Sequence, residues 1–77
     1  MRAKFQAAFL ADAETQSELT LHAQRSADLA RMNRLAENMN DGKMAVRVQI
    51  LIQKENDRHD QRMAALEAAF RAKGGTP

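Results

Sequence analysis

Two stretches of the chain carry the same polar side chains at the same spacing. ELTLHAQR runs from Glu18 to Arg25 and ENDRHDQR from Glu55 to Arg62, so the pattern E-x-x-x-H-x-Q-R recurs after 37 residues. Glutamate and histidine four residues apart lie on one face of an α-helix. Their carboxylates and imidazoles can pair with each other, with arginine or with a divalent metal ion. The candidate residues are Glu18, His22, Arg25, Glu55, His59 and Arg62.

Two interpretations of this pattern are open. In the favoured one, the six side chains form a structural polar layer, which sets helix register because a shifted pairing leaves charges unpaired. In the other, Glu18, His22, Glu55 and His59 hold zinc or another divalent ion. The di-iron bundle motif spaces Glu and His by three residues rather than four, and the neighbouring arginines repel a cation. We therefore expect no cofactor.

Glycine and proline delimit the helices that must position these residues. The first 40 residues contain neither, and the chain is rich in strong helix formers. Asn40-Asp41-Gly42 predicts a turn, with Gly42 in the left-handed conformation and Asn40 or Asp41 capping the next helix. We predict a single all-α domain over residues 1–77. It has one helix over about 3–39, a turn at 40–42, a second helix over about 43–72 and a frayed tail at 73–77.

Two local signals offer alternatives to this division. Thr15-Gln16-Ser17-Glu18 has the form of a capping box, which would start the first helix at Thr15 and leave Arg2–Ala11 as a separate short helix or arm. We favour one continuous helix. In residues 44–52, β-branched side chains alternate as in a strand, but no second run of this kind is present to pair with. A helix is favoured there, and a strand exchanged between two chains is the alternative.

Apolar residues at three- and four-residue spacing predict a coiled-coil-like antiparallel hairpin. With the turn centred near Asp41, residues equally far from it face each other. Apolar then meets apolar near the turn, as with Leu29 and Ile52. In the polar stretch the expected pairs are Glu18 with Arg62, Arg25 with Glu55, and His22 with His59. Two facing histidines repel when both are protonated, which is a weaker, pH-dependent hypothesis.

The hairpin seam does not use every apolar residue. Leu21, Leu35, Val46 and Ile50 are expected on another face, and leaving them in water forgoes roughly 1.5–3 kcal/mol for each. A second hairpin would cover them in a two-fold dimeric four-helix bundle. A helical partner protein is the alternative.

The three phenylalanines are expected to gather at the end of the hairpin opposite the turn. Phe5 and Phe9 are one helical turn apart, and Phe70 lies opposite Ala11 in the predicted register. The favoured interpretation is a small satellite core that holds the helix ends together. An aromatic docking patch for a partner is the alternative.

The amino-acid composition argues against several classes of protein. The 77 residues include no Cys, Tyr or Trp and two His, with a formal net charge of +2. No apolar run is long enough for a membrane span, and the lack of Cys is typical of the cytoplasm. No nucleophile with an oriented base and no Gly-rich loop is evident, so we expect neither an enzyme nor a small-molecule substrate. The Ala- and Arg-rich composition is typical of bacterial or phage chains.

We therefore expect a small protein-interaction or assembly module, such as an adaptor, chaperone, inhibitor or structural subunit, that works by helix packing. A dimeric hairpin that binds RNA or DNA is an alternative that we do not favour. It would use exposed cations, whose charges are interspersed with acidic residues rather than clustered. They are Arg31, Arg34, Arg47, Lys54, Arg58 and Arg71.

Overall fold

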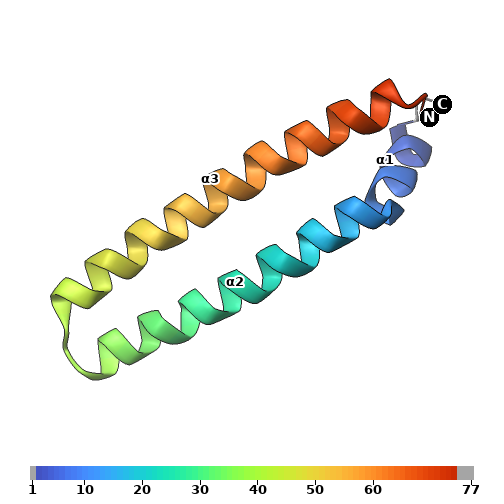
Figure 1. The fold of residues 1–77 in the computed structure, drawn as a ribbon. Helices are drawn as coiled ribbons and strands as arrows, with labels where there is room; N and C mark the ends of the chain where they lie inside the picture. Colours follow the sequence, from blue (N-terminus) through green and yellow to red (C-terminus); the bar gives the residue numbers. More distant parts are fainter. Residues whose placement is uncertain (1, 75–77) are drawn as a thin grey trace.

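The computed structural model describes the backbone of residues 2–74 and the side chains of residues 6–74. In this range the chain forms three helices and no strand: α1 (Arg2–Ala11), α2 (Ala13–Asn38) and α3 (Gly42–Ala72). Helices α2 and α3 run antiparallel beside each other and are joined by a tight turn (Figure 1). The predicted all-α helical hairpin is confirmed. Residues 44–52 are helical, with Val48 buried in their middle, and the part of the chain that the structure describes offers no strand with which they could pair.

The turn ends α2 by satisfying its last carbonyl groups. Asn40 has φ +53°, and its N–H donates to the carbonyl of Glu37, while the N–H of Asp41 donates to the carbonyl of Ala36. This pair of bonds around a left-handed residue is a Schellman motif. The left-handed residue was predicted to be Gly42, which is wrong, because Gly42 is the first residue of α3. Asparagine tolerates this conformation better than most side chains do.

Asp41 caps the N-terminus of α3, as one of the two predicted capping residues. Its backbone is extended, and its carboxylate accepts a hydrogen bond from the Met44 N–H at 3.0 Å. We expect Asp41→Ala to lower the free energy of unfolding by about 1 kcal/mol, because a free N–H then loses its acceptor. Urea denaturation followed by helical circular dichroism measures this change. Asp41→Asn is the matched control. Because it keeps an acceptor at this position, its free energy of unfolding should fall by only roughly a few tenths of a kcal/mol.

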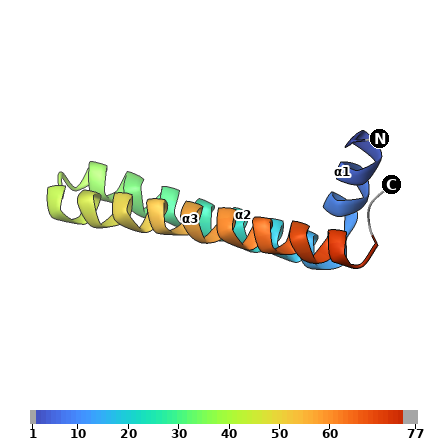
Figure 2. The ribbon, with the colours of Figure 1, turned by 90° about the horizontal axis from the view of Figure 1, so that it is seen from above.

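The prediction of one continuous helix before the turn is wrong. The backbone leaves the helical conformation at Asp12 (φ −61°, ψ 139°), which separates α1 from α2. The alternative with Arg2–Ala11 as a separate helix had the right bounds but the wrong cap, since Thr15 is buried inside α2. Figure 2 shows α1 turned out of the axis of the hairpin. Aspartate favours helix starts over helix interiors, so the break falls at a residue suited to it.

The break allows Phe9 to close the end of the hairpin. Phe9 and Leu66 are buried there, with Met63 and Phe70 packed around them. The rings of Phe9 and Phe70 lie 5.7 Å apart between centroids and are tilted by 56°, an ordinary aromatic contact. Phe9 and Phe70 therefore meet as the satellite-core interpretation requires. The side chain of Phe5 lies outside the described residues.

Between its two ends the hairpin has a thin core. In the described part of the chain, the buried apolar residues besides Phe9 and Leu66 are Ala36 and Val48. Leu29 and Ile52, expected to face each other, line one shallow hollow together. The other buried side chains of α2 and α3 are polar: Thr15, Glu18 and Glu55. Two carboxylates thus occupy the middle of a helix interface, where they must be paired.

Candidate functional site

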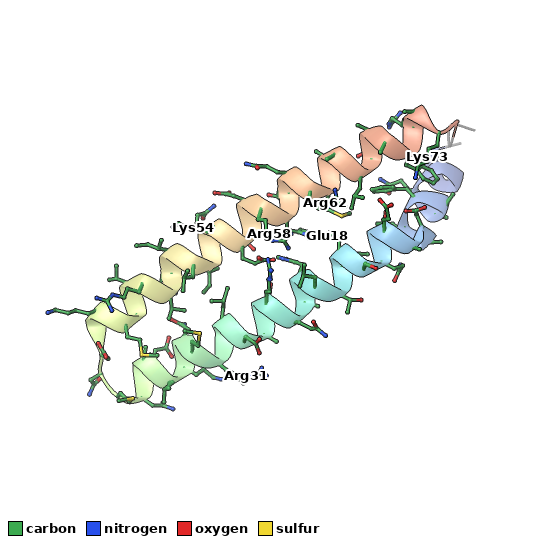
Figure 3. All side chains as sticks on the ribbon, in the orientation of Figure 1. Glu18, Arg31, Lys54, Arg58, Arg62 and Lys73 are labelled. Atoms are coloured by element: carbon green, nitrogen blue, oxygen red, sulfur yellow. The ribbon has the colours of Figure 1, made fainter. Side chains whose placement is uncertain are left out.

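Six polar side chains, two of them histidines, form a layer between α2 and α3, here called the ionic layer. Helix α2 contributes Glu18, His22 and Arg25, and helix α3 contributes Glu55, Arg58 and His59. In Figure 3, Glu18 and Arg58 point toward each other in the space between the two helices. Both glutamates are almost fully buried, at 5% and 7% exposure. The layer contains five of the six residues that the repeated sequence pattern predicted, and one that it did not.

The two histidines lie where the predicted register placed them. The His22 and His59 rings are stacked, with centroids 3.8 Å apart and planes 10° from parallel. Each ring bonds the glutamate of the opposite helix: His59 Nδ1 lies 2.7 Å from Glu18, and His22 Nδ1 lies 3.0 Å from Glu55. An ionised carboxylate only accepts hydrogen bonds, so each Nδ1 carries the proton and donates. The two Glu–His pairs cross between the helices in a nearly symmetric way.

Arg58 is the residue that sequence reasoning missed. Its Nη1 and Nη2 atoms each donate to Glu18 at 2.9 Å, and its Nε and Nη2 atoms donate to Glu55 at 2.9 and 2.7 Å. One guanidinium therefore joins both buried carboxylates, a geometry that only its planar set of donors allows. The available signal was its position three residues after Glu55, on the same side of α3.

The predicted Glu18–Arg62 pair is wrong. Arg62 is exposed and makes no hydrogen bond or ion pair with the side chains of residues 6–74. Arg58 and His59 already fill the oxygens of Glu18, and an arginine that reaches two buried carboxylates outcompetes one that reaches a single carboxylate. The predicted Arg25–Glu55 pair is present, at a longer 3.4 Å, with Arg25 half exposed. In the sequence repeat Arg58 corresponds to Leu21, so the bridging residue is what breaks the internal symmetry.

The electrostatics of the layer follow from these bonds. Hydrogen bonds from Arg58 lower the pKa of Glu55 to about 2, with smaller contributions from His22 and Arg25 that together outweigh burial. Hydrogen bonds from Arg58 and His59 likewise lower the pKa of Glu18. The same bonds to Glu55 and Glu18 raise the pKa of Arg58. Glu18, Glu55 and Arg58 are therefore held in their ionised, paired forms at neutral pH.

Acid should weaken the hairpin through these glutamates. A carboxylate whose pKa is depressed on folding stabilises the fold above its unfolded pKa and loses that contribution as pH falls through the folded value. For Glu55 this window runs from the ordinary value of 4.5 down to about 2. We expect the contribution of Glu55 to the melting temperature to be nearly constant from pH 7 to about 5 and to fall steeply below that. Thermal melts of the wild type and of Glu55→Gln measure this.

The variant isolates the contribution of Glu55 from that of the other carboxylates. Glu55→Gln should melt below the wild type at pH 7, and the difference should shrink toward pH 2, because protonation removes the same charge from the wild type. A difference that stays constant across this range would contradict the ionised, Arg58-bonded form of Glu55.

The geometry of the layer is unfavourable for a metal ion. The two imidazoles are stacked, so the lone pairs on their Nε2 atoms lie in nearly parallel planes and do not meet at one ion. Both glutamates are occupied by Arg58. Across residues 6–74, no group of three or more His, Cys, Asp or Glu side chains is arranged to hold a metal. What the layer can do chemically is fix the relative position of α2 and α3.

The four apolar residues predicted to meet a partner are all exposed. Leu21 is 36% exposed, Leu35 50%, Val46 61% and Ile50 51%. Four more large apolar side chains share this property and were not in the predicted set: Leu10, Met32, Met39 and Leu51. Most of them lie in the half of the hairpin near the turn. No described helix is long and apolar enough to cross a bilayer.

The cations considered for nucleic-acid binding are partly neutralised within the chain. Arg31 pairs with Asp28, Arg71 with Glu67, and Arg58 with the two buried glutamates. Figure 3 shows Arg31 on the outer side of α2, away from the row of Lys54, Arg58 and Arg62 on α3. The six cations therefore do not form one continuous basic surface, as binding to phosphates along a nucleic acid requires.

No family model, curated protein or solved structure matches this chain. The geometry of the hairpin and its ionic layer is therefore the basis for the function proposed below.

Proposed function

We propose that this chain is a small non-enzymatic interaction module that packs its two long helices against helices of a second chain, completing a four-helix bundle. The observation that supports this proposal is the set of large apolar side chains that the hairpin leaves in water. The set consists of Leu10, Leu21, Met32, Leu35, Met39, Val46, Ile50 and Leu51, each at least 36% exposed.

The energy available from covering these residues is large for a chain of this size. Fully burying one such side chain contributes roughly 1.5–3 kcal/mol, and each of these is already partly covered. Small domains have a net stability of about 5–15 kcal/mol. Four buried apolar residues in the described part of the chain make a small core by comparison. Covering several of these side chains with a second pair of helices would therefore add stability of the same order as that of the hairpin itself.

The ionic layer contributes specificity to such a module. A shift of α2 against α3 by one helical turn would separate Glu18 from Arg58 and His59. The buried charge of Glu18 would then be unpaired, which costs several kcal/mol. The layer thus holds the two helices in one register. This keeps the exposed apolar side chains in a constant arrangement, which a partner surface needs.

Sedimentation equilibrium and native mass spectrometry of the purified protein test the proposal. One chain has a mass of 8.6 kDa, and we expect a species of two chains to dominate between about 1 and 100 µM. A single-chain mass over this whole range would contradict self-assembly. Salt-sensitive binding to a mixed nucleic-acid pool, without self-assembly, would favour the nucleic-acid alternative instead.

A further inference from the structure

One face of the hairpin carries apolar and charged side chains from both long helices. An open groove of about 450 Å³ lies between α2 and α3, with Asp28 and Leu29 on one side and Leu51 and Lys54 on the other. At about 100° per residue, Met32 and Leu35 of α2 fall on the same side of their helix as Asp28. Arg47 of α3 likewise falls beside Leu51 and Lys54. We call this surface the groove face: Asp28, Met32, Leu35, Arg47, Leu51 and Lys54.

Val46 and Ile50 are not part of the groove face. Each lies two residues from Val48, which is 1% exposed and packs against α2. Two residues correspond to about 200° around a helix, so Val46 and Ile50 point away from α2. The four exposed residues that the sequence grouped into one partner surface are therefore divided between two surfaces. Leu35 belongs to the groove face, and Ile50 belongs to the outer side of α3.

The two sides of the groove face complement each other at two of its three levels along the hairpin, and at the third level Leu35 lies beside Arg47. Asp28 lies thirteen residues before Asp41, and Lys54 lies thirteen residues after it. Met32 and Leu51 are nine and ten residues from Asp41. An acidic residue of one helix thus lies level with a basic residue of the other, and an apolar residue lies level with an apolar one.

We propose that the groove face binds the groove face of a second copy of this chain, about a two-fold axis parallel to the helices. This inference rests on the proposed function and names its partner. The rotation places α2 of each chain on α3 of the other, with both turns at the same end. Asp28 then meets Lys54 of the partner subunit, and Met32 meets Leu51 of the partner subunit. Such an interface is isologous and closed.

The charges and the size of the groove face suit a second copy of this chain. Asp28 pairs only with exposed Arg31 in its own chain, a contact worth little, and Lys54 has no hydrogen bond or ion pair among the described side chains. Beneath the groove, Arg25 and Arg58 are balanced by Glu18 and Glu55, so the ionic layer brings no net charge to the interface. A hairpin 52 Å long and 18 Å wide offers the roughly 800 Å² per partner that a stable interface needs.

The first test compares two equally exposed apolar residues on different faces. Leu35 and Ile50 are 50% and 51% exposed, so lysine at either position changes the solvation of the monomer alike. In the dimer, lysine at position 35 would also meet Arg47 of the partner subunit, a like charge. We expect Leu35→Lys to raise the dimer dissociation constant at least about a hundredfold and Ile50→Lys to change it less than about threefold. Sedimentation equilibrium gives the constants, and circular dichroism confirms helicity. Equal effects, or a larger effect of Ile50→Lys, would overturn the assignment of the face.

The second test exchanges the charges of the proposed ion pair. Asp28→Lys and Lys54→Asp should each raise the dissociation constant about tenfold or more, because like charges then meet twice in each dimer. The double variant should recover most of the lost dimer affinity. Asp60→Lys, at an exposed position about 120° around α3 from Lys54, is the control and should have little effect. No recovery in the double variant would exclude this symmetry.

The outcomes separate this inference from the proposed function. A wild-type dimer that is insensitive to Leu35→Lys and to the charge exchange leaves the interaction module standing and excludes the groove face. A wild type that stays a single chain at all concentrations excludes both self-assembly and the second copy as the occupant of the groove.

Discussion

Arg58→Met is expected to lower the melting temperature by about 15 °C, the largest effect of any single side-chain replacement in the ionic layer. The side chain of Arg58 donates four hydrogen bonds to Glu18 and Glu55. Methionine preserves the aliphatic part of the side chain and removes every donor. Two buried carboxylates then face each other with only the histidines and the half-exposed Arg25 as partners, and an uncompensated buried charge is strongly destabilising.

Arg62→Met is the matched control for this experiment. It removes the same charge four residues later on α3, from an exposed side chain with no bonding partner among residues 6–74. We expect the melting temperature to change by no more than about 3 °C. Both variants should be compared with the wild type at one protein concentration, because assembly raises apparent stability. Equal effects of the two replacements would show that Arg58 does not bridge the glutamates.

A double-mutant cycle would measure the coupling within the layer. If Arg58 stabilises the hairpin through Glu18, Arg58→Met should lower the free energy of unfolding much less in the Glu18→Gln variant than in the wild type. Independent, additive effects would mean that the two groups act separately. This cycle also tests the register function, since only coupled groups can penalise a shifted helix.

Leu66→Ala is expected to lower the free energy of unfolding by about 3 kcal/mol. Leu66 is 4% exposed and forms, with Phe9, the centre of the cluster that closes the open end of the hairpin. Truncation removes apolar contacts and leaves a cavity beneath the Phe9 and Phe70 rings. Urea denaturation at fixed protein concentration measures the loss.

The same replacement should release α1 selectively. Among the described side chains of α1, residues 6–11, Phe9 is the buried one, and it packs against Leu66. Amide hydrogen exchange in α1 should become faster in Leu66→Ala, while the amides of α2 and α3 near the turn keep their protection relative to global unfolding. Leu10→Ala, at a 42% exposed position of α1, is the control and should change stability by less than about 1 kcal/mol. Unchanged exchange in α1 would contradict the role of Phe9.

Much of the layer was predictable because a regular hairpin translates sequence distance into position. Once Asn40-Asp41-Gly42 is recognised as the turn, residues equally far from it face each other, and His22 meets His59. The partner of Glu18 was not predictable in this way. Arg58 and Arg62 lie one helical turn apart, and both are within reach of the same level of α2. Only the side-chain geometry shows that one guanidinium can bond both carboxylates at once.

The break at Asp12 was unpredictable for a similar reason. No glycine or proline interrupts residues 1–40, and local preferences are compatible with a continuous helix. The break follows from a contact between residues far apart in sequence, because Phe9 reaches Leu66 and Phe70 only when α1 turns out of line with α2. Aspartate at position 12 lowers the free-energy cost of leaving the helical conformation, but aspartate alone does not force the break.

By itself the sequence determined the helical class, the position of the turn, the two candidate caps Asn40 and Asp41, and the facing histidines, because these depend on local preference and on even spacing along rigid helices. The tertiary structure alone decided the separation of α1, the choice of Arg58 over Arg62 and the division of the exposed apolar residues between two faces. Each of these depends on how side chains from different helices meet in space. Helical periodicity assigns a residue to a side of its own helix, and only the packing of α2 on α3 shows which sides form a common surface.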